Sequence, residues 1–204
     1  MTPEDLANLR SDYQKLRREA IEDYRQNLKA DTLLSSLRRC ADVTLAKLLE
    51  YCPLPKGAAL AAVGGYGRGE LYPFSDVDLL ILLQRDPSPE EESSLGLLVT
   101  AMWDLGLEPG YSVRTIDQCI AEADGDITVE TSMLETRWIA GSKKLIQTFI
   151  SAMKARLDPY KFFQAKRAEM QQRHARYQDT PYALEPNCKE SPGGLRDLQV
   201  IMWM

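Results

Sequence analysis

The chain has 204 residues, of which 44% are hydrophobic and 27% are charged, as is typical of an ordinary globular protein. Its net charge of −5 argues against a dedicated nucleic-acid binder, because such proteins usually carry a basic excess. No apolar run approaches the length of a membrane span, and the acidic N-terminus lacks the apolar region of a signal peptide. We therefore expect neither a nucleic-acid partner nor a membrane partner.

The cysteines and the single histidine narrow the chemistry further. The four cysteines are scattered without metal-ligand spacing, which favours reduced thiols in a cytoplasmic protein; they are Cys40, Cys52, Cys119 and Cys188. His174 lies in a polar helical stretch, where we expect a solvated surface side chain. With one histidine, we do not expect histidine-based metallophosphohydrolase chemistry, nor a Ser-His triad that needs a second histidine.

Helices are predicted for the first quarter of the chain. Apolar residues at three- and four-residue steps predict an amphipathic helix over 4–29, suited to packing or partner contact. A second helix, capped by Asp31 and Thr32, ends at the proline-rich turn over 52–57. The first strand then begins near Ala58, so residues 1–57 form an N-terminal helical region.

A glycine-rich turn and two aspartates follow this strand. Residues 64–70 read GGYGRGE, and residues 75–78 read SDVD before the apolar run 79–83. Because residues two apart in a strand share a face, Asp76 and Asp78 are expected to project together, across from the turn. Adjacent carboxylates repel each other unless a cation lies between them, and Mg²⁺ or Mn²⁺ suits such oxygen ligands. The glycines leave backbone N–H groups open to a phosphate.

Neither part of this pattern is specific alone, since glycine-rich strings and Asp-x-Asp pairs are common. The combination of a strand, Gly-Gly, Arg-Gly, Ser-Asp-x-Asp and a second strand resembles the signature of the DNA polymerase β-like nucleotidyltransferase superfamily. That resemblance implies metal-dependent nucleotidyl transfer.

The rest of the chain alternates less regularly. Pro89 begins a helix that Gly106 ends, and the alternating run 111–116 is expected to be a third strand beside the aspartate-bearing one. Further helices are predicted after Asp117 and over 127–140, 143–156 and 160–177. The predicted fold is α+β: a small mixed β-sheet nucleotidyltransferase core over 58–141, flanking helices, and a helical extension over 142–204.

The stretch 184–199, LEPNCKESPGGLRDLQ, contains a tight Pro-Gly-Gly turn that feeds a helix. Helix N-termini attract anions, and Lys189 and Arg196 flank this one, so both are candidate nucleotide ligands. The alternative is a structural turn with surface charges beside it. The apolar run 200–203 is unfinished at the last residue, so we expect a fragment of a longer protein.

Two blocks, GGYGRGELYPFSDVDLLIL and LEPNCKESPGGLRDLQ, resemble the bacterial PII-uridylyltransferase/uridylyl-removing enzyme family. WDLG at 103–106 and YSVRT at 111–115 support a resemblance over roughly residues 30–204. The resemblance implies transfer of UMP from UTP to a tyrosine of the P-II nitrogen-regulatory signal protein, with release of pyrophosphate. The family's hydrolase and glutamine-sensing ACT domains are absent from these 204 residues, so removal of uridylyl groups by the family's route is not expected.

The resemblance also implies roles for single residues. Gly64 and Gly65 match glycines that approach the triphosphate, and Ser75 matches the serine before the carboxylates. Asp76 and Asp78 match the catalytic metal ligands for Mg²⁺ or Mn²⁺. For Arg68, two roles stay open: a phosphate contact or an internal ion pair.

The chain departs from the wider superfamily at one position. Many members carry a third carboxylate on the strand beside the Asp-x-Asp strand, where this chain has Ser112. Asp126 and Glu130 are possible substitutes.

Two other functions stay open as well: an adenylyltransferase or uncharacterised nucleotidyltransferase of the same superfamily, and an inactive nucleotide-binding module.

Overall fold

The computed structural model describes residues 1–177, 179–180, 185 and 187–204. Its centre is a four-stranded mixed sheet in the order β3-β2-β1-β4. β1 runs antiparallel to both β2 and β4, whereas β2 and β3 are parallel. The small mixed sheet predicted from the sequence is confirmed. The strands are β1 (Ala59–Ala62), β2 (Val77–Leu83), β3 (Pro109–Thr115) and β4 (Arg137–Gly141).

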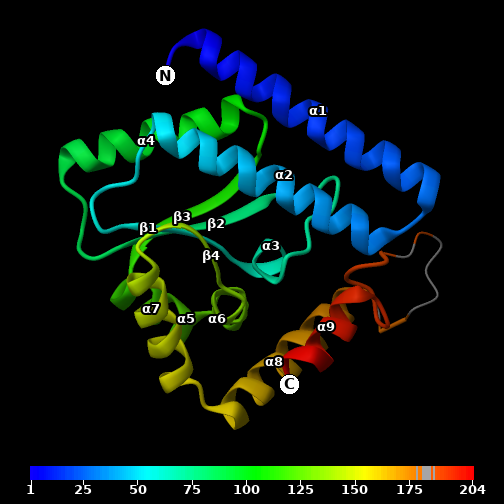
Figure 1. Cartoon of the computed structure of the whole chain (residues 1–204). Helices are drawn as coiled ribbons and strands as arrows, with labels where there is room; N and C mark the ends of the chain where they lie inside the picture. Colours follow the sequence, from blue (N-terminus) through cyan, green and yellow to red (C-terminus); the bar gives the residue numbers. More distant parts are fainter. Residues whose placement is uncertain (178, 181–184, 186) are drawn as a thin grey trace.

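Helices cover both faces of the sheet (Figure 1). Alternate strand residues point to opposite faces, so Leu79 and Ile81 enter one core and Leu80 and Leu82 enter the other, all almost fully buried. The first core is shared with α1 (Pro3–Asn27), α2 (Ala30–Tyr51) and α4 (Pro89–Asp104). The second is shared with α5 (Ile116–Gly125), α6 (Ile127–Leu134) and α7 (Lys143–Arg156).

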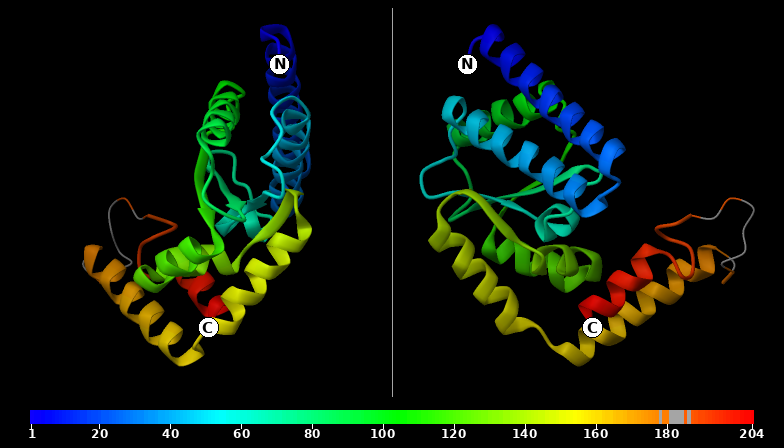
Figure 2. Two further views of the ribbon diagram at one scale, coloured as in Figure 1. Left: turned by 90° about the vertical axis from the view of Figure 1, so that its left-hand side faces the viewer. Right: turned by 45° about the vertical axis from the view of Figure 1, so that its right-hand side comes forward.

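The last two helices extend away from the sheet. α8 (Pro159–Arg176) and α9 (Leu195–Trp203) lie side by side as a hairpin, and α8 also contacts α6 (Figure 2). This arrangement brings the C-terminal part of the chain near α3 (Gly64–Arg68), the short helix that follows β1.

Several predicted elements are wrong in detail. The glycine-rich turn is the short helix α3, and the predicted helix over 127–140 divides into α6 and the edge strand β4. β4 forms because it pairs with β1 across the sheet, a contact that local periodicity does not reveal. The helix cap expected at Asp117 lies at Thr115, and the cap expected at Asp31 and Thr32 lies at Lys29.

The remaining predictions agree more closely. α4 begins at Pro89 behind a Ser88 cap, and β3 lies beside β2 as expected. All four cysteines are free. Within the described part of the chain, no helix combines the length and apolar character needed to cross a membrane.

Candidate active site

The carboxylate of Asp78 lies between two glycines at the start of β2. Asp78 pairs with Gly110 on β3, where an added Cβ would lie 2.8 Å from its Oδ1. A Cβ on Gly64, which has a φ of +57°, would lie 3.5 Å from its Oδ2. Glycine at Gly110 therefore leaves room for the carboxylate, and the structure brings together the predicted residues Gly64 and Asp78.

The second aspartate, Asp76, adds a negative charge beside Asp78. Asp76 is exposed in the loop before β2, whereas Asp78 is partly buried. Burial raises the pKa of Asp78, the nearby charge of Asp76 raises it further, and Lys189 acts in the opposite direction. Two carboxylates that repel each other fit a hard divalent cation. Among the described residues no group of three or more His, Cys, Asp or Glu side chains is placed to hold a metal ion. Asp76 and Asp78 are the two predicted carboxylates that could contribute ligands.

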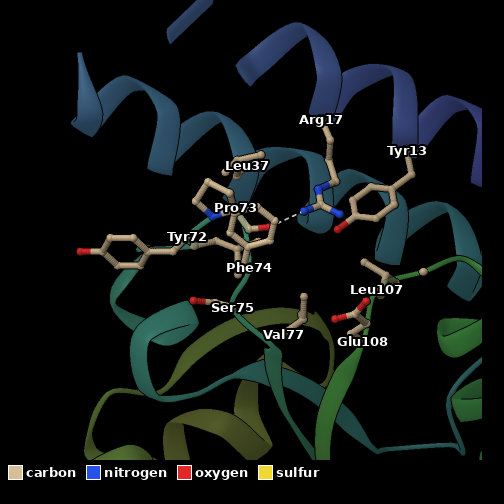
Figure 3. A pocket seen from close by; sticks show the side chains of 12 residues that line it. Tyr13, Arg17, Leu37, Tyr72, Pro73, Phe74, Ser75, Val77, Leu107 and Glu108 are labelled. Carbon is tan, nitrogen blue, oxygen red and sulfur yellow. Dashed lines mark hydrogen bonds between the residues drawn. The ribbon is translucent and has the colours of Figure 1, made fainter. Parts of the chain in front are cut away.

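Helix α1 supports the loop that carries Ser75 and Asp76. Arg17 donates a hydrogen bond of 2.6 Å to the carbonyl oxygen of Pro73, and a cavity of about 270 Å³ lies between this loop and α1 (Figure 3). Ser75 is exposed, and the neighbouring Phe74 is fully exposed. The sequence indicated a packing helix here but did not reveal that it holds the aspartate-bearing loop.

The glycine turn is anchored to α2 through a buried tyrosine. Tyr66, 1% exposed, donates a hydrogen bond of 2.6 Å to Asp42. Arg137 of β4 donates two bonds of 3.0 Å to the same carboxylate and one of 3.3 Å to the Tyr66 carbonyl oxygen. Burial, together with the charge of Asp42, raises the pKa of the Tyr66 hydroxyl. Sequence reasoning missed this network because its residues are far apart in the chain: Tyr66 lies within the glycine-rich motif, but Asp42 and Arg137 belong to no motif.

The fourth residue of α3 lies against the end of α6. A Cβ on Gly67 would lie 1.8 Å from the carbonyl oxygen of Glu135, so only glycine fits there. Gly64 and Gly65 open the same helix. The string of glycines therefore serves close packing as well as access to the site.

Of the two roles expected for Arg68, the structure favours the internal ion pair. Its guanidinium donates a bond of 2.5 Å to Glu135 and bonds of 3.2 and 3.0 Å to Glu70. The side chain is 18% exposed, and these partners raise the pKa of the guanidinium against the effect of burial. Arg68 therefore holds α3 against the end of α6.

The second sequence block forms a tightly bonded loop in front of α9. The backbone N–H groups of Leu195 and Arg196 donate to the carbonyls of Cys188 and Lys189, each at 2.9 Å. A Cβ on Gly194 would lie 2.9 to 3.0 Å from three carbonyl oxygens, which explains the glycine. Two residues of this block, Leu184 and Pro186, lie outside the described residues.

The two cations of this loop are placed differently. Lys189 is exposed, and its charge acts on Asp78. Arg196 instead bonds to Gln199 at 3.1 Å and lies 3.5 Å from a carboxylate oxygen of Glu190. Of the two cations, Lys189 acts on Asp78 through its charge, whereas Arg196 is engaged within the loop and helix.

The expectation of a solvated histidine is wrong. His174 is partly buried, and its Nε2 lies 2.9 Å from both carboxylate oxygens of Asp197 on α9. Arg173 donates to the same carboxylate at 2.7 Å and to the carbonyl of Glu190 at 2.9 Å. This cluster joins α8 to the loop and to α9.

A second cavity, of about 210 Å³, adjoins the site on the α6 side of the sheet. Ser112 and Asp126 both line it, and so does Ser132, which lies beside Gly64. Asp126 also caps α6, whereas Glu130 is paired with Arg156 at 2.8 Å. Of the two acids considered as a third carboxylate, Asp126 is therefore the one on the cavity wall.

Comparisons with known proteins show what the chain is similar to. A family model described as a nucleotidyltransferase domain matches residues 45–136, and one described as GlnD PII-uridylyltransferase matches residues 161–204. The chain is 65% identical over all 204 residues to a bifunctional uridylyltransferase/uridylyl-removing enzyme of Bordetella avium. Over its whole length the chain is similar to this uridylyltransferase family. It matches the N-terminal part of these enzymes.

Other relatives of the uridylyltransferase family give the same result. Enzymes of that name from Cupriavidus pinatubonensis and Burkholderia lata are 53% and 48% identical over the whole chain. In each of these three relatives the chain spans 24% of the full length. Of the two blocks noted in the sequence, the first lies within the nucleotidyltransferase match and the second within the uridylyltransferase match. The chain therefore carries an enzymatic nucleotidyltransferase domain.

Proposed function

We propose that this chain transfers UMP from UTP to a tyrosine of the P-II signal protein, releasing pyrophosphate, in the cytoplasm. The observation that carries the proposal is the carboxylate pair Asp76 and Asp78. Of the two, Asp78 lies between Gly64 and Gly110 and is acted on by the charges of Asp76 and Lys189. The similarity to the uridylyltransferase family supports uridylyl transfer as the reaction.

In this proposal Asp76 and Asp78 hold one or two Mg²⁺ or Mn²⁺ ions, which when bound polarise the α-phosphate and stabilise the leaving pyrophosphate. Gly64 and Gly65 let the phosphates approach the backbone without meeting a side chain. Lys189 adds a positive charge beside the carboxylates. Most of the catalysis is then positioning and charge stabilisation, as in other phosphoryl transfers.

The acceptor hydroxyl must lose its proton during the reaction, because a tyrosine has a pKa of about 10. Asp126 on the wall of the cavity that also holds Ser112 is the carboxylate we propose for that proton. Ser75, in the loop supported by α1, is proposed as a phosphate contact. Arg68 and Arg196 are proposed to act indirectly, by holding the elements around the nucleotide.

The test is transfer of label from α-³²P-labelled UTP to purified P-II, with ATP as the competing nucleotide. We expect Mg²⁺-dependent labelling from UTP that Asp78→Asn abolishes. The matched control is Asp104→Asn, which removes an exposed carboxylate at the end of α4 that belongs to neither sequence block.

Three outcomes would contradict the proposal in different ways. Near-normal transfer by Asp78→Asn would exclude a metal-ligand role for this carboxylate. A preference for ATP would indicate an adenylyltransferase. Failure of the wild-type chain to bind either nucleotide by calorimetry with Mg²⁺ would indicate an inactive module.

A further inference from the structure

The indole ring of Trp203 on α9 lies among three cationic side chains. The Lys166 ammonium is 4.6 Å from the ring centroid, and the guanidinium carbons of Arg196 and Arg68 are 5.7 and 5.9 Å away. These distances are within the range of cation–π attraction. The three cations come from α8, α9 and α3, so the ring contacts segments that are far apart in sequence.

A single carboxylate completes this set of contacts. Glu135, directly after α6, accepts a bond of 2.5 Å from Trp203 Nε1 on one oxygen and a bond of 2.5 Å from Arg68 on the other. Its side chain is 10% exposed, so water competes little for either oxygen. Charge-assisted bonds at low exposure are among the stronger hydrogen bonds in proteins.

Helix α9, which carries Trp203, is bonded directly to the loop that carries Lys189. Arg196 donates its backbone N–H to the Lys189 carbonyl at 2.9 Å, and Asp197 accepts a bond of 2.7 Å from the Gly193 N–H. A displacement of α9 therefore moves this loop. A displacement of Arg68 moves α3, whose first residue, Gly64, lies beside Asp78.

We propose that Trp203 is a positioning residue, which acts through Glu135 and Arg68 to set the glycine helix α3 and the Lys189 loop together against Asp78. This inference rests on the proposed function insofar as Gly64 and Lys189 contact the nucleotide. None of the sequence motifs includes Trp203, and its effect on the site is indirect.

The first experiment measures amide hydrogen exchange by mass spectrometry and needs no activity. Trp203→Phe keeps an aromatic ring among the cations but removes the N–H that Glu135 accepts. We expect faster exchange both in residues 64–70 and in residues 187–196. The matched control is Trp138→Phe on β4, outside the site. Trp138 likewise donates its Nε1–H, to the Gly141 carbonyl at 3.3 Å, and has the Lys143 ammonium 4.4 Å from its ring centroid.

The second experiment measures the kinetics of uridylyl transfer. Loss of one bond to a charged group corresponds to about a 10-fold effect, and we expect it as a rise in the KM for UTP with little change in kcat. Combining Trp203→Phe with Lys189→Met should raise KM by less than the product of the single effects, because both changes remove the same positioning of Lys189. Glu135→Gln, of nearly the same shape, should repeat the effect of Trp203→Phe.

The outcomes separate this inference from the proposed function. If Trp203→Phe and Trp138→Phe give the same exchange in residues 64–70 and 187–196, the positioning role is refuted, whatever the activity. Fully multiplicative KM effects with Lys189→Met would refute it as well. Faster exchange in both segments of Trp203→Phe, with no UTP transfer by the wild-type chain, would keep the coupling and reject uridylyl transfer instead.

Discussion

Replacing Gly67 by alanine tests the central packing contact of the site. The added Cβ would lie 1.8 Å from the carbonyl oxygen of Glu135, more than 1 Å closer than the 3.0 Å below which real Cβ contacts essentially never fall. Overpacking a well-filled interior typically costs about 1–3 kcal/mol, and here the obstacle is backbone that no rotamer change can move. We therefore expect Gly67→Ala to lower the free energy of unfolding by about 3 kcal/mol or more.

The assay is thermal and urea unfolding of the whole chain. For a chain of this size about 1 kcal/mol shifts Tm by roughly 2–4 °C, so the expected fall in Tm is about 6–12 °C. Nucleotide binding should weaken too, because α3 must move away from α6 and Gly64 moves with it.

The matched control is Gly96→Ala in the middle of α4, where an added Cβ meets nothing within 4 Å. Alanine has the higher helix propensity, so this change should raise stability by about 1 kcal/mol, the opposite sign for the same chemical substitution. If the Gly67→Ala protein unfolds within about 1 °C of the wild type, the packing argument is refuted.

The remaining predictions concern single polar groups. Asp78→Asn should leave Tm equal or higher in the presence of EDTA, because a raised pKa means that ionised Asp78 costs stability at neutral pH; a lower Tm would contradict this. Tyr66→Phe should cost about 1.5–3 kcal/mol in urea unfolding, since Asp42 loses its shortest bond. Asp197→Asn should destabilise the chain at pH 7. Although burial alone would raise the pKa of Asp197, bonds from Arg173, His174 and the Gly193 N–H lower it, so its contribution is present above the ordinary pKa and is lost as pH falls below 3.8. Urea unfolding of the wild type and of Asp197→Asn at pH 7 and at about pH 3 checks this. The same difference in free energy of unfolding between the two proteins at both pH values would contradict it.

The sequence predicted the motif and its strands because both depend on local chemistry. Glycines, adjacent carboxylates and alternating apolar residues constrain the backbone within a few positions, so β2 fell near its expected place and β3 lay beside β2. The glycine-rich segment between β1 and β2 was also located, although it is a short helix and not a turn. The predicted helix over 127–140 failed for the opposite reason. Residues 137–141 are a strand only because β1 offers an edge to pair with, and that edge is more than 70 residues earlier in the chain.

The supporting residues of the site could not be predicted for the same reason. Asp42, Tyr66 and Arg137 form one network across three elements, and none stands out by spacing or by local composition. Arg68 shows the limit of a motif: its type and position were evident, but whether it contacts phosphate or a carboxylate depends on Glu135, which lies 67 residues away.

The short helix α3 is held from opposite sides, and this arrangement explains how a five-residue helix can serve a reaction that depends on position. On one side Tyr66 is bonded to Asp42 of α2, and on the other Arg68 is bonded to Glu135 beside Trp203. Helices this short are not stable on their own, because too few hydrogen bonds offset the cost of nucleation. The two side-chain anchors replace that missing stability and leave the glycine end of α3 free of side chains. The order of the proposed nucleotide site is therefore a property of the surrounding elements. Substitutions at Asp42 or Glu135 should impair the proposed transfer, which the labelling assay with UTP measures.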